Sequence, residues 1–126
     1  MAKSALTPEQ IPPAFILALR FWCTEGGTEP VRDWLRELPA ESRKAIGEDL
    51  KTVQLGWPLG MPLVRKLEAD LWETRSHILD GIARVLFTTT GGAMVLLHGF
   101  VKKSQKTPIN ELETARRRLR QLRGTP

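Results

Sequence analysis

Between residues 63 and 102, apolar and polar side chains alternate with a period of two, which is the pattern of β-strands. The strand-like segments are LVRKLE (63–68), DLWETRS (70–76), GIARVLFTTT (81–90) and AMVLLHGFVK (93–102), with turn-like connections at HILD (77–80) and GG (91–92). Connections this short can join only antiparallel neighbours. The segment therefore predicts an antiparallel meander, around which the rest of the chain must pack.

Two helices are predicted before this meander. The sequence GGTEPVRDWLREL (26–38) has helical spacing, with Thr28 as its cap and Pro30 in its first turn. A second helix is predicted for AESRKAIGEDLKTVQL (40–55), which ends before Gly56. The short connection between the two segments indicates a helical hairpin.

One further strand and one further helix complete the order of elements. FILALRFW (15–22) precedes the first helix as a strand, and TPINELETARRRLRQLR (107–123) follows the meander as a helix that Thr107 and Glu111 would open. The apolar face of this last helix consists of Leu112, Ala115, Leu119 and Leu122. The order strand, two helices, several strands, helix predicts an α+β domain, with the helices packed on one face of a curved sheet.

A length of 126 residues suits one domain, expected over residues 14–123 after a flexible leader of residues 1–13. No stretch reaches the roughly 18 to 20 apolar residues of a membrane span, and no signal peptide is evident. The single cysteine, Cys23, fits a reducing compartment. Two histidines, one cysteine and no clustered carboxylates argue against a zinc site. We therefore expect a cytoplasmic protein that needs no metal or cofactor.

The positive charge is concentrated at one end of the chain. From Lys102 onward there are eight Lys or Arg and two Glu, a net charge of +6, whereas the first 101 residues have eleven Lys or Arg and twelve Asp or Glu, a net charge of −1. Such a basic segment suits an anionic partner, such as nucleic acid, the ribosome or an acidic protein. A solvated basic helix without a ligand is the alternative interpretation.

Arg75 and Arg84 are candidate site residues because the predicted hairpin brings them together. If residues 77–80 turn the chain, Arg75 lies directly opposite Arg84. Two facing arginines repel each other unless an anion, Glu73 or Asp80 lies between them. Either one arginine pairs with a carboxylate, or the two together clamp a phosphate.

His98 is a candidate site residue near the end of the last strand. Strict alternation puts it on one face with Met94, Leu96, Phe100 and Lys102. A lone histidine in an apolar strand is usually buried and hydrogen-bonded. The presence of Lys102 on the same face favours a second interpretation, in which the two side chains share a catalytic site.

Further cations surround this part of the predicted sheet. Lys103 and Lys106 follow the last strand, and Arg65 and Lys66 lie on an earlier strand, where they widen the basic surface. Gly99, next to the histidine, marks either a β-bulge or a close backbone approach.

A metal-free set of Arg, Lys and His side chains points to cleavage of RNA by its own 2′-hydroxyl. The 2′-oxygen attacks the adjacent phosphorus in line, and negative charge develops on the non-bridging oxygens and on the departing 5′-oxygen. Preorganised cations stabilise this charge more strongly in the transition state than in the substrate. Because DNA lacks the 2′-hydroxyl, it should be inert.

The segments LWETRS, GIARVLF and HGFVKKSQKTP, with the basic helix after them, together resemble the RelE/ParE superfamily of toxins from bacterial type II toxin–antitoxin systems. The similarity is greatest to the phage-derived, HigB-type branch, which EPVRDWLRELP (29–39) also fits. It covers nearly the whole chain after Pro13. The combination of these segments is specific, although no single segment is.

The resemblance implies a RelE-like fold and ribosome-dependent cleavage of mRNA by an endoribonuclease that inhibits translation. It also implies a cognate antitoxin, commonly of the helix-turn-helix type, which neutralises the toxin and represses the operon. Operator DNA would then be contacted only through the antitoxin, while the toxin itself would bind the ribosome and mRNA. The basic C-terminal helix is expected to contact ribosomal RNA or the antitoxin.

The resemblance also implies roles for individual residues. The family's strand-end arginine falls on Arg75, and its basic position after the last strand falls on Lys102 or Lys103. Several members use a tyrosine in the site, whereas this sequence contains none, so His98, Lys102 or Lys103 would take the acid–base role. Phe100 or Trp72 would stack on a base. The family's hairpin arginine falls on Arg84, which acts either in the chemistry or in holding the sheet. Together with the cations that widen the basic surface, the residues expected to bind RNA are Arg65, Lys66, Arg84 and Lys106.

Two alternatives remain open on the sequence. A ParE-like protein of the same fold would inhibit DNA gyrase by binding it, without cleaving RNA. A non-catalytic relic would only bind nucleic acid or its antitoxin. Transcript cleavage inside translating cells separates the nuclease from both.

Overall fold

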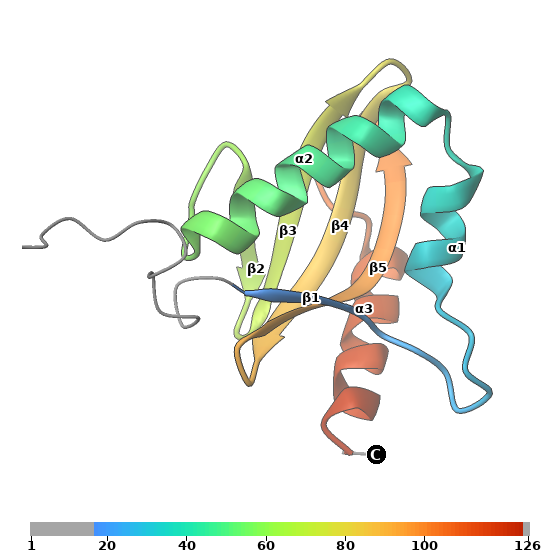
Figure 1. The fold of residues 1–126 in the computed structure, drawn as a ribbon, viewed down its shortest axis with the longest axis vertical. Coiled ribbons are helices and arrows are strands. Elements are labelled where there is room, and N and C mark those ends of the chain that lie inside the picture. The colour runs from blue at the N-terminus through green and yellow to red at the C-terminus, as the bar shows by residue number, and fades with distance from the viewer. Residues whose placement is uncertain (1–16, 125–126) are drawn as a thin grey trace, which may run out of the picture.

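The computed structural model describes residues 17–124 (Figure 1), so the expected leader of residues 1–13 lies outside the described residues. The elements are β1 (Ala18–Phe21), α1 (Pro30–Glu37), α2 (Ala40–Gly56), β2 (Val64–Glu68), β3 (Leu71–Ile78), β4 (Gly81–Thr90), β5 (Ala93–Lys102) and α3 (Ile109–Leu122). This order confirms the predicted α+β class, and β4 and β5 have the predicted bounds.

The sheet has the strand order β1-β5-β4-β3-β2 (Figure 1). The strands from β2 to β5 form the predicted antiparallel meander, whereas β1 pairs parallel to β5 and makes the sheet mixed. Gly91 and Gly92 join β4 to β5 with φ values of 54° and 77°. This left-handed backbone of a two-residue hairpin turn favours glycine. β3 continues through His77 and Ile78, which were predicted in the turn.

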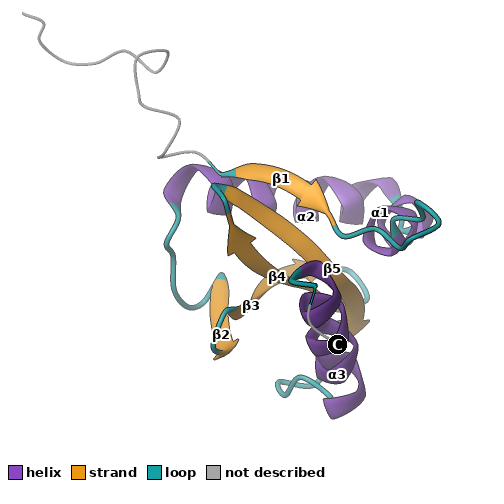
Figure 2. Cartoon of the chain, turned by 90° about the horizontal axis from the view of Figure 1, so that it is seen from below, coloured by secondary structure: helices purple, strands orange, loops and turns teal. Residues whose placement is uncertain are grey.

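Helices cover both faces of the sheet: α1 and α2 lie on one side and α3 on the other (Figures 1 and 2). The first core joins Val31, Ile46, Leu50 and Val53 of the helices to Val85, Phe87, Met94 and Leu96 of the sheet. The second core joins Ala115 and Leu119 of α3 to Leu71, Leu86, Val95 and Leu97. The prediction that the helices pack on one face is therefore wrong. Both faces of β3 to β5 carry apolar side chains, and each face needs a cover.

A β-bulge in β5 changes which side chains share a face. The register shifts there, from Leu86↔His98 to Phe87↔Leu96, which leaves Leu97 as the extra residue. Beyond the bulge, His98 and Phe100 lie on the α3 side, whereas Met94 and Leu96 pack on the α1 and α2 side. Strict alternation therefore fails: His98 does not share a face with Met94 or Leu96.

The predicted helix caps are not formed. Glu29 is the N-cap of α1 and makes no side-chain cap hydrogen bond, so the prediction that Thr28 caps this helix is wrong. Pro108 is the N-cap of α3. The side chains of Thr107 and Glu111 instead contact β3 and β5, respectively. Residues that suit a local cap are thus used to attach α3 to the sheet.

Candidate active site

Arg75 of β3 lies directly opposite Arg84 of β4, as predicted from the hairpin. The pairing continues from Arg84 to Phe100 of β5. In the next row of the sheet, Arg65 of β2 lies opposite Glu73 of β3. Alternation puts the side chains of both rows on one face. Three arginines and one glutamate from three neighbouring strands therefore meet on the side of the sheet that faces α3.

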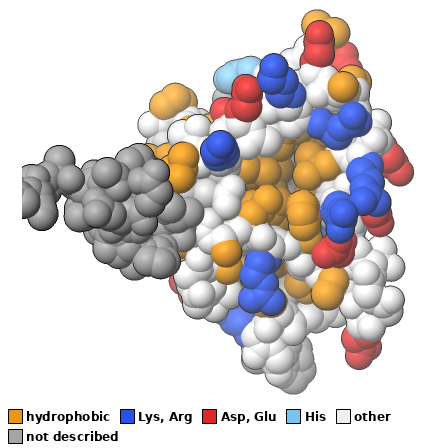
Figure 3. Space-filling view, in the orientation of Figure 1, with side chains coloured by type: hydrophobic (Ala, Val, Ile, Leu, Met, Phe, Trp, Pro, Cys, Tyr) orange, Lys and Arg blue, Asp and Glu red, His pale blue; other side chains and the backbone are white. Residues whose placement is uncertain are grey.

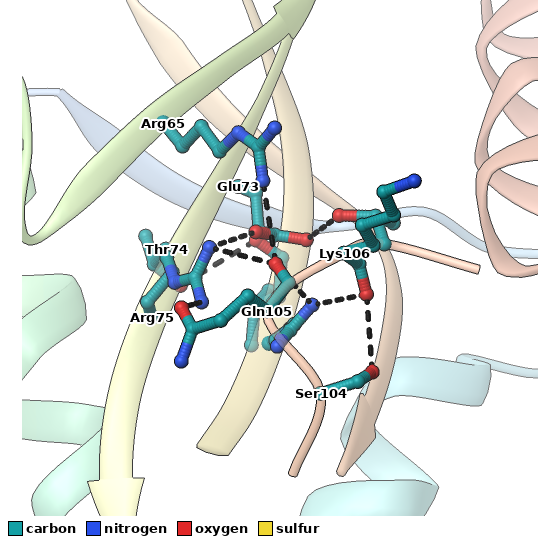
Figure 4. A network of polar contacts seen from close by, with 10 residues as sticks. Arg65, Glu73, Thr74, Arg75, Ser104, Gln105 and Lys106 are labelled. Carbon is teal, nitrogen blue, oxygen red and sulfur yellow. Dashed lines mark hydrogen bonds and ion pairs between the residues drawn. The ribbon is translucent and has the colours of Figure 1, made fainter. Parts of the chain in front are cut away.

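The three guanidinium groups converge on one oxygen atom in the segment between β5 and α3 (Figure 4). The Nη1 atoms of Arg65, Arg75 and Arg84 each lie 3.4 Å from the main-chain carbonyl oxygen of Gln105. Nη2 of Arg75 also donates to Oε1 of Gln105 at 3.1 Å, and Nη1 of Arg84 donates to the carbonyl oxygen of Lys106 at 2.8 Å. We call these three side chains the arginine cradle.

Glu73 supplies the compensating negative charge beneath the cradle. Its side chain is fully buried, and its Oε1 lies 3.6 Å from Nη1 of Arg75. Its Oε2 accepts a hydrogen bond of 2.6 Å from Oγ1 of Thr107. The interpretation that a carboxylate relieves the repulsion between the arginines is confirmed.

Arg84 is the most enclosed member of the arginine cradle, with no exposed surface. Burial is the main cause that lowers its pKa from the ordinary value. The attraction of Glu73 opposes this shift, and repulsion from Arg75 and Arg65 adds to it. An arginine remains charged under these conditions, so the cradle keeps a surplus of positive charge over the single glutamate.

The predicted site lysines differ in where they lie relative to the arginine cradle. Lys102, Lys103 and Lys106 are exposed around the segment that covers the arginines. Lys66 lies away from them, because its ammonium group is 5.9 Å from the ring centroid of Trp72. Trp72 packs with the core under α1 and α2, on the other face of the sheet from Arg75. The structure therefore brings Arg65, but neither Lys66 nor Trp72, into the predicted site.

His98 is held by contacts to α3. Its Nε2 lies 2.7 Å from Oε1 of Glu111, so this nitrogen donates to the carboxylate. Nδ1 is then the acceptor facing Nη1 of Arg118 at 3.5 Å. Burial lowers the pKa of His98, against the opposing effect of the hydrogen bond to Glu111. The ring of Phe100 packs beside His98, with 5.7 Å between the two ring centroids. The guanidinium carbon of Arg84 lies 5.9 Å from the centroid of the Phe100 ring.

Several arginines of α3 have structural contacts. Arg116 makes hydrogen bonds through Nε and Nη2 to Glu68, the shortest of them 2.7 Å, and this pairing lowers the pKa of that carboxyl group. Arg123 pairs with Asp70 at 2.8 Å. Arg118 donates to the carbonyl oxygen of Leu97 at 2.8 Å. The basic character of this helix in the sequence thus overstates the charge available to a partner.

The sequence alone did not indicate Gln105 or Thr107 as site residues. Both lie in an irregular segment, where no hydrophobic period assigns a direction to a side chain. Glu73 could be found, since alternation puts it on the face of Arg75.

No group of three or more His, Cys, Asp or Glu side chains arranged to hold a metal ion occurs within the described part of the chain. Among residues 17–124, no helix combines the length and the apolar character needed to cross a membrane.

The family model for "Phage derived protein Gp49-like (DUF891)" matches residues 33–120, and the chain belongs to this family. The matched range includes the whole arginine cradle, the lysines around it and most of α3. The predicted resemblance to the phage-derived, HigB-type group is thereby confirmed.

Two proteins from two strains of Mycobacterium tuberculosis, both named "Probable endoribonuclease HigB1", are 33% identical to this chain over 79 residues. The alignment covers 63% of this chain and 62% of each relative. The chain therefore spans a little over three fifths of the length of these curated relatives.

Proposed function

We propose that this chain is the toxin of a type II toxin–antitoxin pair and acts as an endoribonuclease that cleaves mRNA on the ribosome. The family membership and the printed name of the mycobacterial relatives support this proposal. The observation that carries it is the convergence of Arg65, Arg75 and Arg84 on one oxygen, with exposed lysines around them. Such a cluster suits a phosphodiester, whose oxygens accept several charged hydrogen bonds at once.

The proposed reaction uses the 2′-hydroxyl of RNA as the nucleophile. Its oxygen attacks the adjacent phosphorus, a P–O bond forms, and the bond to the 5′-oxygen of the next nucleotide breaks. Charge grows on the non-bridging oxygens during this step, and Arg75, with Arg84 and Arg65, would stabilise it. Positioning the attacking and leaving oxygens in line would supply a further part of the acceleration.

Two protons must move in this step: the 2′-hydroxyl releases its proton to solvent water, and the leaving 5′-oxygen must receive one. In this proposal the exposed ammonium groups of Lys102 and Lys103 supply it, and Lys106 binds a neighbouring phosphate. Both ring nitrogens of His98 face side chains of α3, so we assign His98 to positioning the end of β5 rather than to proton transfer. Phe100, which was expected to stack on a base, is buried in the core beside His98 and Arg84, so base stacking is not assigned to it.

The proposed partners follow from the same assignment. A cognate antitoxin, of the helix-turn-helix type, would neutralise the toxin and contact operator DNA for both. Ribosome and mRNA would be the targets in the cytoplasm. Exposed cations of α3, such as Arg117 and Arg120, would add attraction to ribosomal RNA that depends on salt concentration.

The decisive variant is Arg75→Ala, expressed by induction in bacteria with transcript 5′ ends mapped within minutes. We expect wild type to arrest growth and to create new ends inside translated codons. Arg75→Ala should lower the cleavage rate by about a hundredfold or more, because one preorganised donor to the developing charge is lost. Arg36→Ala, an exposed arginine of α1, is the matched control and should behave as wild type.

Other outcomes would contradict the proposal in different ways. Growth arrest with DNA breaks and no new transcript ends would indicate a gyrase inhibitor. A folded wild-type protein that causes no arrest would indicate a binding protein without nuclease activity. Full activity in Arg75→Ala, with the fold confirmed by circular dichroism, would remove the arginine cradle from the reaction.

A further inference from the structure

The segment of residues 103–107, which we call the strap, covers the arginine cradle (Figure 4). Every group that the strap presents to the cradle is an oxygen: the carbonyl oxygens of Gln105 and Lys106 and the side-chain Oε1 of Gln105. These uncharged oxygens receive the hydrogen bonds that the non-bridging oxygens of a phosphate would otherwise receive. The strap therefore occupies the position of an anion.

The arginine cradle has more hydrogen-bond donors than the strap has acceptors for them. Within residues 17–124, Nε and Nη2 of Arg84 are buried without a hydrogen-bond partner, although this side chain has no exposed surface. Unpaired buried groups of a charged residue are costly, and a bound anion is one arrangement that would satisfy them. An anion with full negative charge would satisfy the cradle better than neutral carbonyl groups do.

The strap is also lightly attached. Residues 103–106 are exposed and belong to no helix or strand. Apart from the arginines, the hydrogen bond from Oγ1 of Thr107 to Glu73 is its tie to the sheet within residues 17–124. The hydroxyl of Ser104 bonds within the strap, to Lys106. Little buried apolar surface has to be exposed when such a segment moves.

We propose that the strap is a displaceable cover and that a backbone phosphate of RNA binds the arginine cradle by replacing the oxygens of Gln105. The choice of RNA rests on the proposed function, whereas the exchange of strap oxygens for a phosphate rests on the contacts alone. The displacement also moves Lys103 and Lys106, which belong to the strap. Binding of a phosphate by the cradle therefore changes the positions of these two lysines.

Inorganic phosphate is the probe for this exchange, because it needs neither the ribosome nor cleavage. Phosphate is titrated into the full-length protein at constant ionic strength, and the Nε–Hε signals of arginine are followed by NMR. We expect saturable shifts of the signals of Arg65, Arg75 and Arg84. Gln105→Ala removes the side-chain oxygen that competes for Arg75 and should tighten phosphate binding by about tenfold.

A second variant, Thr107→Val, releases the strap from Glu73 without changing the size of the side chain and should also tighten binding. Gln121→Ala on α3 and Thr52→Val on α2 make the same chemical changes at exposed positions away from the cradle and should bind as wild type. Equal phosphate affinity in wild type, Gln105→Ala and Thr107→Val would overturn the proposal. Unmoved arginine signals in the folded wild type would also overturn it.

This test is separate from the test of the nuclease. If phosphate binds the cradle more tightly in Gln105→Ala while transcripts stay intact in cells, the strap proposal stands and the nuclease proposal fails. If transcripts are cleaved but the Gln105 and Thr107 variants bind phosphate as wild type does, the strap proposal fails alone.

Discussion

At the scale of single residues, His98 illustrates how one side chain can couple stability to pH. It is 17% exposed, and both ring nitrogens face side chains of α3. Burial lowers its pKa below the ordinary value of 6.5, so the folded protein binds this proton less readily than the unfolded chain. The contribution of a neutral His98 to stability is therefore complete above about pH 6.5 and is lost as the pH falls through the lowered pKa.

We predict that the urea midpoint of the wild type decreases between pH 7.5 and pH 5.5. In His98→Gln, which keeps a donor toward Glu111, this decrease should be smaller. His77→Gln at the exposed end of β3 is the matched control and should keep the full decrease. The pKa of Glu68 is also lowered, but from 4.5, so its effect falls at lower pH. An equal decrease in all three proteins would contradict the role given to His98.

At the scale of elements, the packing of α1 on β5 depends on the absence of a side chain at Gly99. A Cβ atom built at Gly99 would overlap the ring of Trp34 in α1. The ring therefore lies directly on the backbone of β5, which confirms that this glycine marks a close approach. The β-bulge of this strand lies at Leu97, whereas Gly99 itself pairs in register with Val85, so the interpretation that Gly99 marks a bulge is wrong.

We predict that Gly99→Ala lowers the free energy of unfolding by about 1–3 kcal/mol, because the ring and the helix must move to admit one carbon atom. Gly47→Ala is the control: this glycine lies inside α2, and a Cβ atom there meets nothing within 4 Å. It should raise the free energy of unfolding by about 0.5–1 kcal/mol, through a better helix propensity. Urea unfolding of both variants measures the difference. A loss below the experimental error in Gly99→Ala would show that α1 adjusts freely.

At the scale of the whole molecule, the charge differs from one face to the other. On the face that carries α1 and α2, acidic and basic side chains are interspersed around an apolar centre (Figure 3). The strap side instead combines the arginine cradle with three exposed lysines. Since Arg116 and Arg123 are paired with carboxylates, the lysines of this side are a large part of the charge that a nucleic acid would meet.

We predict that replacing Lys102, Lys103 and Lys106 together by Gln weakens binding to a single-stranded 2′-O-methyl RNA. The slope of log affinity against log salt should fall by about 2, at roughly 0.7 for each phosphate contact to a single strand. Replacing Lys44 and Lys51 of α2 by Gln removes exposed charge from the other face and should leave the slope unchanged. Fluorescence anisotropy at several KCl concentrations gives both slopes. Equal slopes for the lysine triple variant and the wild type would exclude these lysines from the interface.

The features that depend on local period could be predicted from the amino-acid sequence alone. Alternation over residues 63–102, together with the short turns, was enough to predict the meander and the pairing of Arg75 with Arg84. Both follow from the two-residue repeat of a strand, which does not need the rest of the fold. The resemblance in the same segments was likewise sufficient for the family.

The features that depend on contacts between distant segments could be read only from the folded chain. The helical period of a segment does not predict which face of a sheet the helix will cover. The position of α3 therefore follows only from the two cores of the folded protein. The bulge in β5 moves the side chain of His98 to the opposite face of the sheet from Leu96. It arises in the pairing of β5 with β4, which local period does not reveal. Gln105 and Thr107 lie in a segment without a period, and their direction is set by the charges of Arg65, Arg75, Arg84 and Glu73, which only the folded sheet brings together.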